Sequence, residues 1–362
     1  MDSFHPILLQ WYRDNRRQLP WRDTTDPYLI WLSEVILQQT RVNQGLSYYH
    51  RFVTTWPDIR SLAVAHEDEV LKMWQGLGYY SRARNLHQAA REIIVRYDGV
   101  FPSSFEELKQ IKGIGNYTAA AIASIAFGLP EAVIDGNVYR VLSRIFAIDT
   151  PINSKHAKHV FGQLASQLLY SYDPGTYNQA IMEFGALQCT PKNPDCPNCP
   201  LNNQCMAFAR NKVLDFPVKL PKKPVSDRFF NYLIPFVSDN HINKVYIRKR
   251  TENDIWKGLY EFPLIESSNN PEFEQIIQSE QWYRMIAENN YVLHNQSRLY
   301  KHRLTHRLIH ARFFIVKLAK KLDSADEFAL SLIGQNDLGK YAFPRLIDRY
   351  LEESGGFEML TS

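Results

Sequence analysis

All four cysteines of this 362-residue chain lie within one short window, and that clustering limits its possible folds more than any other feature. The window has the spacing C-x6-C-x2-C-x5-C, formed by Cys189, Cys196, Cys199 and Cys205. Four thiolates on a short loop can enclose one soft metal centre, because thiolate suits both zinc and iron–sulfur clusters. Zinc ligands usually come as two close pairs, whereas this window holds one close pair and two single cysteines. The spacing favours a [4Fe–4S] cluster with a structural role, and zinc is the alternative.

The sequence also bears on where the protein works. Disulfides are disfavoured in reducing compartments, where clustered thiols persist. The N-terminus lacks the basic start and long apolar stretch of a signal peptide, and no apolar run approaches the roughly 20 residues that span a bilayer. We therefore expect a cytoplasmic protein, near the nucleoid in a bacterium, without a membrane partner. The net charge of +4 neither requires nor excludes a nucleic-acid partner.

Residues 1–211 have the pattern of an all-α domain. Apolar residues recur there at three- and four-residue spacing, and glycines and prolines separate the segments. The expected helices are Tyr28–Thr40, His87–Tyr97, Ser104–Ile111, Asn116–Phe127, Val138–Phe146 and Lys155–Leu169.

The pattern changes after the cysteines. Residues 212–227 carry three prolines and four lysines, which is typical of a linker. Residues 228–362 contain strand-like runs and one expected helix, so we predict a separate α+β domain of ordinary size. The runs are Phe229–Val237, Lys244–Arg250 and Ala311–Leu318, with the helix near Glu272–Gln281.

A glycine turn between two expected helices is the second strong feature. Gly113 and Gly115 form a tight turn, and an alanine-rich helix begins at Asn116. Glycine lets a phosphate approach the backbone closely, and the new helix offers free N–H groups and its positive dipole end. This arrangement predicts a helix-hairpin-helix, which binds the DNA backbone without reading sequence.

Asp135 follows the hairpin and precedes the helix expected at Val138. Asp is a favoured helix N-cap, which is one interpretation of this residue. In a DNA-binding chain the same carboxylate can also stabilise positive charge on a deoxyribose. The two interpretations are compatible, because capping would hold the carboxylate in place.

The hairpin, the segment Val133–Arg140 (VIDGNVYR) and the cysteine window occur in an order that resembles the helix-hairpin-helix DNA glycosylases of the endonuclease III superfamily. More narrowly, the chain is similar to the MutY-type adenine DNA glycosylases. Leu19–Arg22 (LPWR), Ser33–Thr40 and Gly76–Asn85 support that resemblance. It implies a base excision repair hydrolase that flips out and removes adenine mispaired with 8-oxoguanine or guanine in double-stranded DNA. It also implies a [4Fe–4S] cluster, and we expect a monomer.

Two residues indicate the reaction type. Bifunctional relatives carry a lysine nucleophile two residues beyond the second hairpin glycine, where this chain has Tyr117. Tyrosine cannot form a Schiff base, so we expect a monofunctional enzyme that uses water. Glu34 lies in a strongly apolar expected helix, and burial would raise its pKa and leave it a proton to donate. The resemblance implies that Glu34 protonates N7 of adenine while ionised Asp135 stabilises the oxocarbenium-like sugar.

The resemblance implies further site residues. Tyr117 and Asn137 would lie near the nucleotide and Asp135, and Glu183 is a weaker candidate for the adenine pocket. The remaining residues expected to bind adenine or DNA are Trp21, Arg22, Gln39, Thr40, Leu77, Tyr79, Gly113, Gly115 and Gln179.

The C-terminal domain is similar to a Nudix domain that inspects 8-oxoguanine opposite the adenine. Trp256–Pro263 (WKGLYEFP) carries this similarity. No stretch has the glutamate-rich box that binds magnesium, so we do not expect nucleotide hydrolysis. The family's recognition loop usually reads Phe-Ser-His, and here it corresponds to Leu304, Thr305 and His306. Thr305 keeps a hydroxyl, His306 keeps a donor, and Leu304 replaces an aromatic ring.

Two other functions fit parts of the sequence. One is an endonuclease III-like pyrimidine glycosylase with lyase activity, against which Tyr117 and the second domain argue. The other is a non-enzymatic iron–sulfur DNA-binding sensor, against which Glu34 and Asp135 argue, because binding requires neither carboxylate.

Overall fold

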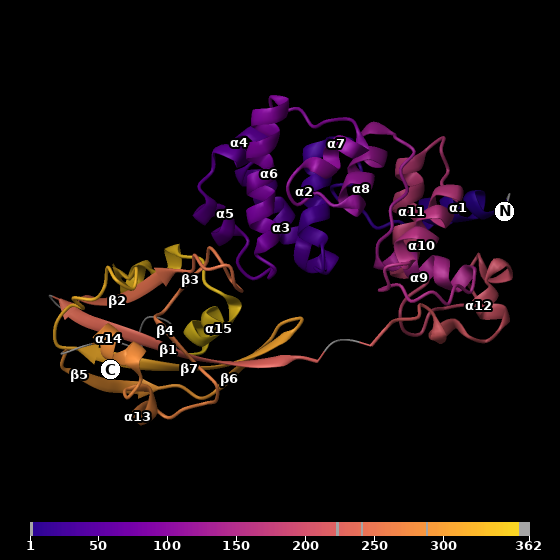
Figure 1. Ribbon diagram of the computed structural model, residues 1–362. Coiled ribbons are helices and arrows are strands. Elements are labelled where there is room, and N and C mark those ends of the chain that lie inside the picture. Colours follow the sequence, from indigo (N-terminus) through magenta and orange to yellow (C-terminus); the bar gives the residue numbers. More distant parts are fainter. Residues whose placement is uncertain (1–2, 222–223, 240–241, 287–288, 355–362) are drawn as a thin grey trace. The chain divides into compact units, whose positions relative to one another are not determined.

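The computed structural model describes residues 3–221, 224–239, 242–286 and 289–354 (Figure 1). These residues form two compact units that interleave along the chain. The first unit comprises Met1–Val64 and Asn85–Lys222, and the second comprises Ala65–Arg84 and Lys223–Ser362. Within the described ranges, none of the helices has both the length and the apolar character needed to cross a bilayer.

The first unit is helical. Its α-helices are α1 (Phe4–Asn15), α2 (Pro27–Leu37), α3 (Val42–Thr55), α4 (Ile59–Val64), α6 (Ser81–Tyr97), α7 (Phe105–Gln110), α8 (Asn116–Phe127), α9 (Gly136–Ile145), α10 (Ala157–Gln167), α11 (Pro174–Leu187) and α12 (Met206–Ala209). Short 3₁₀ helices lie at Asn202–Gln204 and Val213–Asp215.

Helix α8 packs at the centre of this unit, against α2, α7 and α11. Its alanines at 119–121 and 123 are buried, and such small side chains let neighbouring helices approach closely. Three aspartates start other helices, because their carboxylates accept main-chain N–H bonds at the N-termini of α2, α9 and α11. Those aspartates are Asp26, Asp135 and Asp173.

The predicted helices are present, with shifted ends. Helix α8 matches its predicted bounds, whereas α2 ends at Leu37 rather than at Thr40. The chain turns there, since Gln39 has a left-handed backbone with φ +58°. Helix α9 begins at Gly136, directly after its cap.

The segment expected to be a linker is partly structured. Val218 accepts a main-chain hydrogen bond from Ile152, and Leu220 exchanges hydrogen bonds with the Asn153 side chain. Strand β1 already begins at Ser226. Residues up to 221 therefore pack with the helical unit, and the predicted boundaries at 211 and 228 stay predictions.

The second unit is built on a mixed sheet. The strands are β1 (Ser226–Asp239), β2 (Ile242–Lys249), β3 (Tyr260–Glu261), β4 (Leu264–Ser267), β5 (Tyr291–Gln296), β6 (Tyr300–Arg303), β7 (Arg307–Leu318) and β8 (Ser331–Gly334). Their order is β3–β2–β1–β7–β5, with β4 also on β1, β6 on β7 and β8 on β2. The long strands β1 and β7 run parallel side by side, and the other pairs are antiparallel (Figure 1).

Both faces of the sheet are covered by a hydrophobic core. Side chains alternate along β1, so this strand contributes to both cores. Phe230 and Tyr232 point into a core that α15 (Arg345–Glu353) closes. Leu233 points into an opposite core, which α13 (Phe273–Ile276) and α14 (Glu280–Ile286) close. The sequence predicted one helix at Glu272–Gln281, but there are two, because Ser279 accepts N–H bonds that start α14. A 3₁₀ helix at Gln335–Lys340 completes the unit.

The segment Ala65–Arg84, with helix α5 (Glu67–Met73), belongs to this second unit by its contacts. The Asp68 carboxylate accepts hydrogen bonds from Lys249 Nζ at 2.5 Å and from the Tyr260 hydroxyl at 3.0 Å. Gln75 Nε2 donates to Asp348 Oδ1 at 2.5 Å. Residues far apart in sequence are thus joined through polar contacts.

Candidate functional site

A cavity of about 1570 Å³ in the helical unit collects most of the residues predicted to act on DNA. A pocket of this size can hold more than a small ligand. The predicted residues that line it are Trp21, Arg22, Glu34, Gln39, Thr40, Gly113, Gly115, Tyr117, Asp135, Asn137, Gln179 and Glu183.

The hairpin glycines differ in their conformational requirements. Gly113 has φ +82°, and a Cβ placed on it would lie 2.6 Å from the Cβ of Asn85. Gly115 has an ordinary φ, and a Cβ there would meet nothing within 4 Å. Gly113 is thus required for the turn itself, whereas Gly115 leaves the N-terminus of α8 open toward the cavity.

Glu34 is buried on α2 and makes one short contact. The Tyr117 hydroxyl donates a hydrogen bond to Glu34 Oε2 at 2.6 Å. Burial raises the pKa of Glu34 to about 7, against the hydrogen bond from Tyr117, which lowers it. The predicted upward shift is therefore present, and it favours the protonated form of this carboxyl group.

Asp135 is partly buried, and its carboxylate accepts more hydrogen bonds than that of Glu34. Its Oδ1 accepts main-chain N–H bonds from Asn137 and Val138, both at 2.8 Å, and its Oδ2 accepts one from Asn137 Nδ2 at 2.7 Å. Burial raises the pKa of Asp135, and these N–H donors counteract the shift by favouring the carboxylate. Asp135 thus caps α9 and also presents a fixed carboxylate to the cavity.

A chain of hydrogen bonds joins Asp135 to the cysteine loop. Arg140 NH2 donates to Asn137 Oδ1 at 2.9 Å, and Arg140 Nε donates to the carbonyl of Cys189 at 2.7 Å. Asn137 in turn holds Asp135. The first cysteine and the cavity carboxylate therefore share one bridging arginine.

Glu183 is buried but not available as a free acid. Arg17 and Arg22 each donate two side-chain hydrogen bonds to its carboxylate, at 2.5–2.8 Å. Burial alone would raise the pKa of Glu183, but these hydrogen bonds lower it to about 2. Gln179 also lines the cavity. The Tyr12 hydroxyl donates to Gln179 Oε1 at 2.9 Å, so this hydrogen bond uses the amide oxygen of Gln179 and not its N–H groups.

The four cysteines line one small pocket with apolar neighbours, among them Phe184 and Leu201. All four are free thiols. Burial, together with the charge of the neighbouring cysteines, raises the pKa of Cys196 and Cys205. Among the described residues, no group of three or more His, Cys, Asp and Glu side chains is placed as the ligand set of a single metal ion.

The buried Arg144 holds the cysteine loop in place. Its NH1 donates to the carbonyl of Thr190 at 2.7 Å and contacts Cys189 Sγ at 3.3 Å. Its Nε donates to the carbonyls of Val213 and Phe216. A guanidinium beside the thiols suits a donor set that becomes anionic when it binds metal.

The other predicted DNA contacts lie in the second unit. Tyr79, half exposed with φ +48°, has its hydroxyl 3.1 Å from Thr305 Oγ1 in the β6–β7 loop. His306 is exposed, and its carbonyl accepts a hydrogen bond from Ser226 N at 3.1 Å. Leu77, also expected to bind DNA, is buried.

Sequence reasoning missed three residues that shape the cavity: Arg17, Tyr12 and Arg140. Arg140 had a detectable signal, because it lies three residues after Asn137 on a helix, where side chains meet. Arg17 and Tyr12 contact partners more than 160 residues away. Nothing local in the sequence marks them.

Comparison with known proteins agrees with this architecture. Residues 32–166 match the model of the HhH-GPD superfamily base excision DNA repair proteins, and residues 236–353 match that of the NUDIX domain. A solved thermostable thymine-DNA glycosylase aligns with a TM-score of 0.54 and 28% identity, over 58% of this chain and 96% of that one. The predicted helix-hairpin-helix domain followed by a Nudix-like domain is confirmed.

Relatives identified by sequence narrow the family. The adenine DNA glycosylase of Buchnera aphidicola subsp. Schizaphis graminum is 31% identical over 354 residues, 96% of this chain and 98% of the relative. The adenine DNA glycosylase of Mus musculus is 44% identical over 217 residues, 58% of this chain and 42% of the relative. This chain therefore belongs to the adenine DNA glycosylase family of base excision repair hydrolases.

Proposed function

We propose that this enzyme is a monofunctional glycosylase that removes adenine opposite 8-oxoguanine or guanine in double-stranded DNA. The observation that carries the proposal is one cavity lined by two carboxyl groups, of which Asp135 accepts three N–H bonds and Glu34 accepts one O–H bond from Tyr117. Burial raises the pKa of Glu34 to about 7, so it can donate a proton. Asp135 is held by three N–H donors that favour its carboxylate. Two carboxyl groups whose environments give them different roles are the general arrangement for cleaving a glycosidic bond.

The reaction follows from these two environments. The adenine leaves the base stack and enters the cavity, as glycosylase chemistry requires. Glu34 transfers its proton to N7, the C1′–N9 bond breaks, and the bonding electrons leave with the neutral adenine. The Asp135 carboxylate stabilises the cationic sugar. Water adds to C1′ and returns a proton to Glu34, which leaves an abasic site.

Tyr117 supports the monofunctional assignment. A lyase needs an amine at the sugar to form a Schiff base, and this position offers a phenol whose hydroxyl already donates to Glu34. We infer that Tyr117 tunes the acid rather than attacking the sugar.

Two features support recognition of the opposite base by the second unit. Tyr79 is expected to bind DNA, and Thr305 lies in the expected recognition loop. Their hydroxyl groups are within hydrogen-bond distance of each other, and both residues are exposed. Polar groups of this kind can distinguish purine edges by hydrogen bonding.

The cysteine window supports a [4Fe–4S] cluster. Four free thiols line one pocket, with a buried guanidinium beside Cys189. Cys189, Cys196, Cys199 and Cys205 would hold the cluster, which would close the loop as a structural cross-link. Arg140 would then tie that loop to the Asn137–Asp135 pair.

An excision assay tests the function. Purified protein is given duplexes with adenine opposite 8-oxoguanine, guanine or thymine, and abasic product is measured with and without alkali. We expect product from the first two duplexes only, with strand cleavage only after alkali. Cleavage without alkali would favour the lyase, and binding without product would favour the DNA-binding sensor.

The pH dependence of excision tests the roles of Glu34 and Tyr117. With a pKa of about 7, the single-turnover rate should fall about tenfold per pH unit above neutrality, as the acid loses its proton. The hydrogen bond from Tyr117 lowers the Glu34 pKa, so Tyr117→Phe should move this alkaline limb to higher pH.

Tyr28→Phe is the matched control for that change. It also removes one buried phenol, which donates to the carbonyl of Trp56 at 2.6 Å and makes no hydrogen bond to Glu34. Its pH profile should match that of the wild type. A limb in Tyr117→Phe that stays in place or moves to lower pH would contradict the proposed coupling.

A further inference from the structure

The loop that carries Thr305 and His306 is a short hairpin connection between β6 and β7 with exposed side chains. Leu304 N donates to the carbonyl of Arg307 at 2.8 Å, which closes the turn. Ser226 N, at the start of β1, donates to the carbonyl of His306. These bonds fix the backbone register, and an exposed loop needs further contacts to fix the direction of its side chains.

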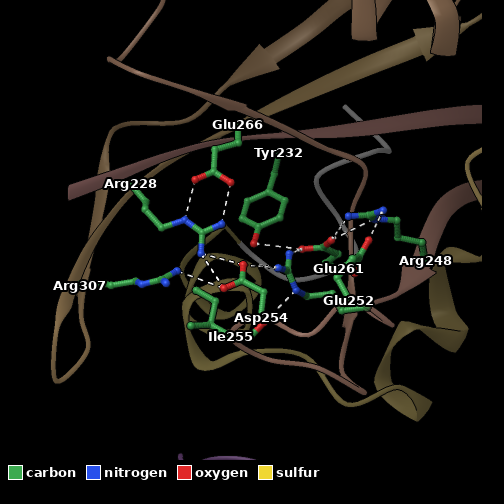
Figure 2. Close-up of polar contacts among 10 residues, drawn as sticks. Arg228, Tyr232, Arg248, Glu252, Asp254, Ile255, Glu261, Glu266 and Arg307 are labelled. Atoms are coloured by element: carbon green, nitrogen blue, oxygen red, sulfur yellow. Dashed lines mark hydrogen bonds and ion pairs between the residues drawn. The ribbon is translucent and has the colours of Figure 1, made fainter. Parts of the chain in front are cut away.

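One carboxylate beside this loop accepts hydrogen bonds from three guanidinium groups. Arg307 NH1, at the first residue of β7, donates to Asp254 Oδ1 at 3.1 Å. Arg228 NH1 donates to both Asp254 oxygens at 2.9 and 2.7 Å, and Arg250 NH2 donates to Oδ2 at 3.1 Å. Figure 2 shows the guanidinium groups of Arg228 and Arg307 both directed at Asp254, with Glu266 on the far side of Arg228.

The other end of this network lies in the core. Arg250, 4% exposed, donates to Glu261 Oε2 at 2.6 Å, and the Glu261 side chain is fully buried. Arg250 Nε also donates to the carbonyl of Ile255 at 3.0 Å, so one arginine holds both the side chain and the adjacent backbone of Asp254. Of the three arginines that donate to Asp254, Arg307 is the most exposed, at 40%.

Because Asp254 is anchored, the ion pair between Arg307 and Asp254 can contribute more free energy than an isolated surface ion pair. An isolated exposed ion pair contributes little, because both side chains must be ordered to form it. Here Arg228 and Arg250 already order Asp254, so only Arg307 loses freedom. Burial opposes ionisation of Asp254, but the Arg228 hydrogen bond and its neighbours outweigh it and lower the Asp254 pKa.

The same segment touches the other strand of the hairpin. Trp256, two residues after Asp254, packs edge-on against His302 of β6, with ring centroids 5.9 Å apart. Asp254 contacts the start of β7 and Trp256 contacts β6. The segment therefore holds both strands that lead into the Thr305–His306 loop.

We propose that Asp254 is a positioning residue for reading the base opposite the adenine, because it holds Arg307 and thereby the orientation of Thr305 and His306. This inference rests on the proposed function of that loop. Both carboxylate oxygens of Asp254 already accept hydrogen bonds from arginines. Asp254 therefore acts on the base indirectly, by holding the loop. Its loss should reduce discrimination between 8-oxoguanine and guanine while leaving the excision step in the other unit unchanged.

The test uses the full chain and five variants: Asp254→Asn, Asp254→Glu, Arg307→Gln, the double variant of Asp254→Asn with Arg307→Gln, and Glu252→Gln. Glu252 accepts only from Arg248 in this network, at 3.1 Å, so its variant removes a similar carboxylate away from the loop. Single-turnover excision rates and duplex affinities are measured for adenine opposite 8-oxoguanine and opposite guanine. Thermal unfolding of each variant is recorded alongside.

Asp254→Asn and Arg307→Gln should each lower the 8-oxoguanine preference about tenfold, the size of one charge-assisted hydrogen bond. The double variant should lose no more than either single variant, because both remove the same contact. Excision opposite guanine should stay within about twofold, Asp254→Glu should restore part of the preference, and Glu252→Gln should resemble the wild type.

Full preference in either single variant, or losses that add in the double variant, would overturn the proposal. If Asp254→Asn fails to fold, Arg307→Gln decides the question alone, because it removes one partly exposed side chain and leaves Asp254 with two partners. A wild-type enzyme without 8-oxoguanine preference would instead refute the proposed function of the loop.

Discussion

Replacing Glu34 with Gln should reduce adenine excision about a thousandfold, which is within the range that a general acid contributes. The amide keeps the shape of the side chain and can still accept the hydrogen bond from Tyr117. It has no proton to transfer to the base. Single-turnover rates at pH 6 measure the effect, where wild-type Glu34 is mostly protonated. A loss of less than tenfold would remove Glu34 from the acid role.

The same variant should be more stable than the wild type in alkaline solution. The Glu34 pKa rises from 4.5 to about 7 on folding, so its stabilising effect is complete below pH 4.5 and disappears as the pH rises through 7. Above pH 8 the buried carboxylate costs up to about 3 kcal/mol, which Gln avoids. Chemical unfolding at pH 5 and pH 8 should show the gain of the variant increasing with pH, and a constant difference would contradict this account.

Asp135→Asn should reduce excision at least about a hundredfold while preserving the fold, because removing a charge-stabilising group costs that much. Asn is as good a helix N-cap as Asp, and its oxygen can still accept the N–H bonds of Asn137 and Val138. The negative charge that would stabilise the sugar cation is lost. Excision rate, duplex affinity and thermal unfolding separate these effects.

Asp173→Asn is the matched control for that substitution. Asp173 caps α11 by accepting from Thr176 N at 3.1 Å, outside the cavity lining. The Asp173→Asn variant should leave the excision rate unchanged. Asp135→Ala should lose about 1 kcal/mol of stability in addition to activity, because it also removes the cap. Full turnover in Asp135→Asn would reduce Asp135 to a helix cap.

Sequence patterns predicted those parts of the fold whose boundaries are specified by nearby residues, such as glycines at helix ends. Helix α8 was predictable to its ends, because Gly115 precedes it and Gly128 ends it in a left-handed conformation. The end of α2 was not predictable, since the turn at Gln39 uses a left-handed residue other than glycine. The break between α13 and α14 depends on Ser279, and serine is favoured both in turns and at helix caps, so its presence does not specify which of the two forms.

The site shows the same division. The placement of Glu34 and Asp135 at one cavity was predictable, because one is a charge in an apolar helix and the other follows a hairpin. The state of Glu183 was not, because it depends on Arg17 and Arg22 from a distant segment. Sequence also could not show that Glu34 accepts from Tyr117, since only tertiary packing brings α2 and α8 together.

Because the two compact units interleave along the chain, the second unit cannot be transferred to another protein as one continuous segment. A chimera that replaced only the residues after the linker would separate Asp68 from Lys249 and Gln75 from Asp348. A transplant that preserves these pairs must carry Ala65–Arg84 together with the C-terminal segment. The second unit is thus encoded by two separate gene segments, and recombination at one point in the gene would transfer only one of them.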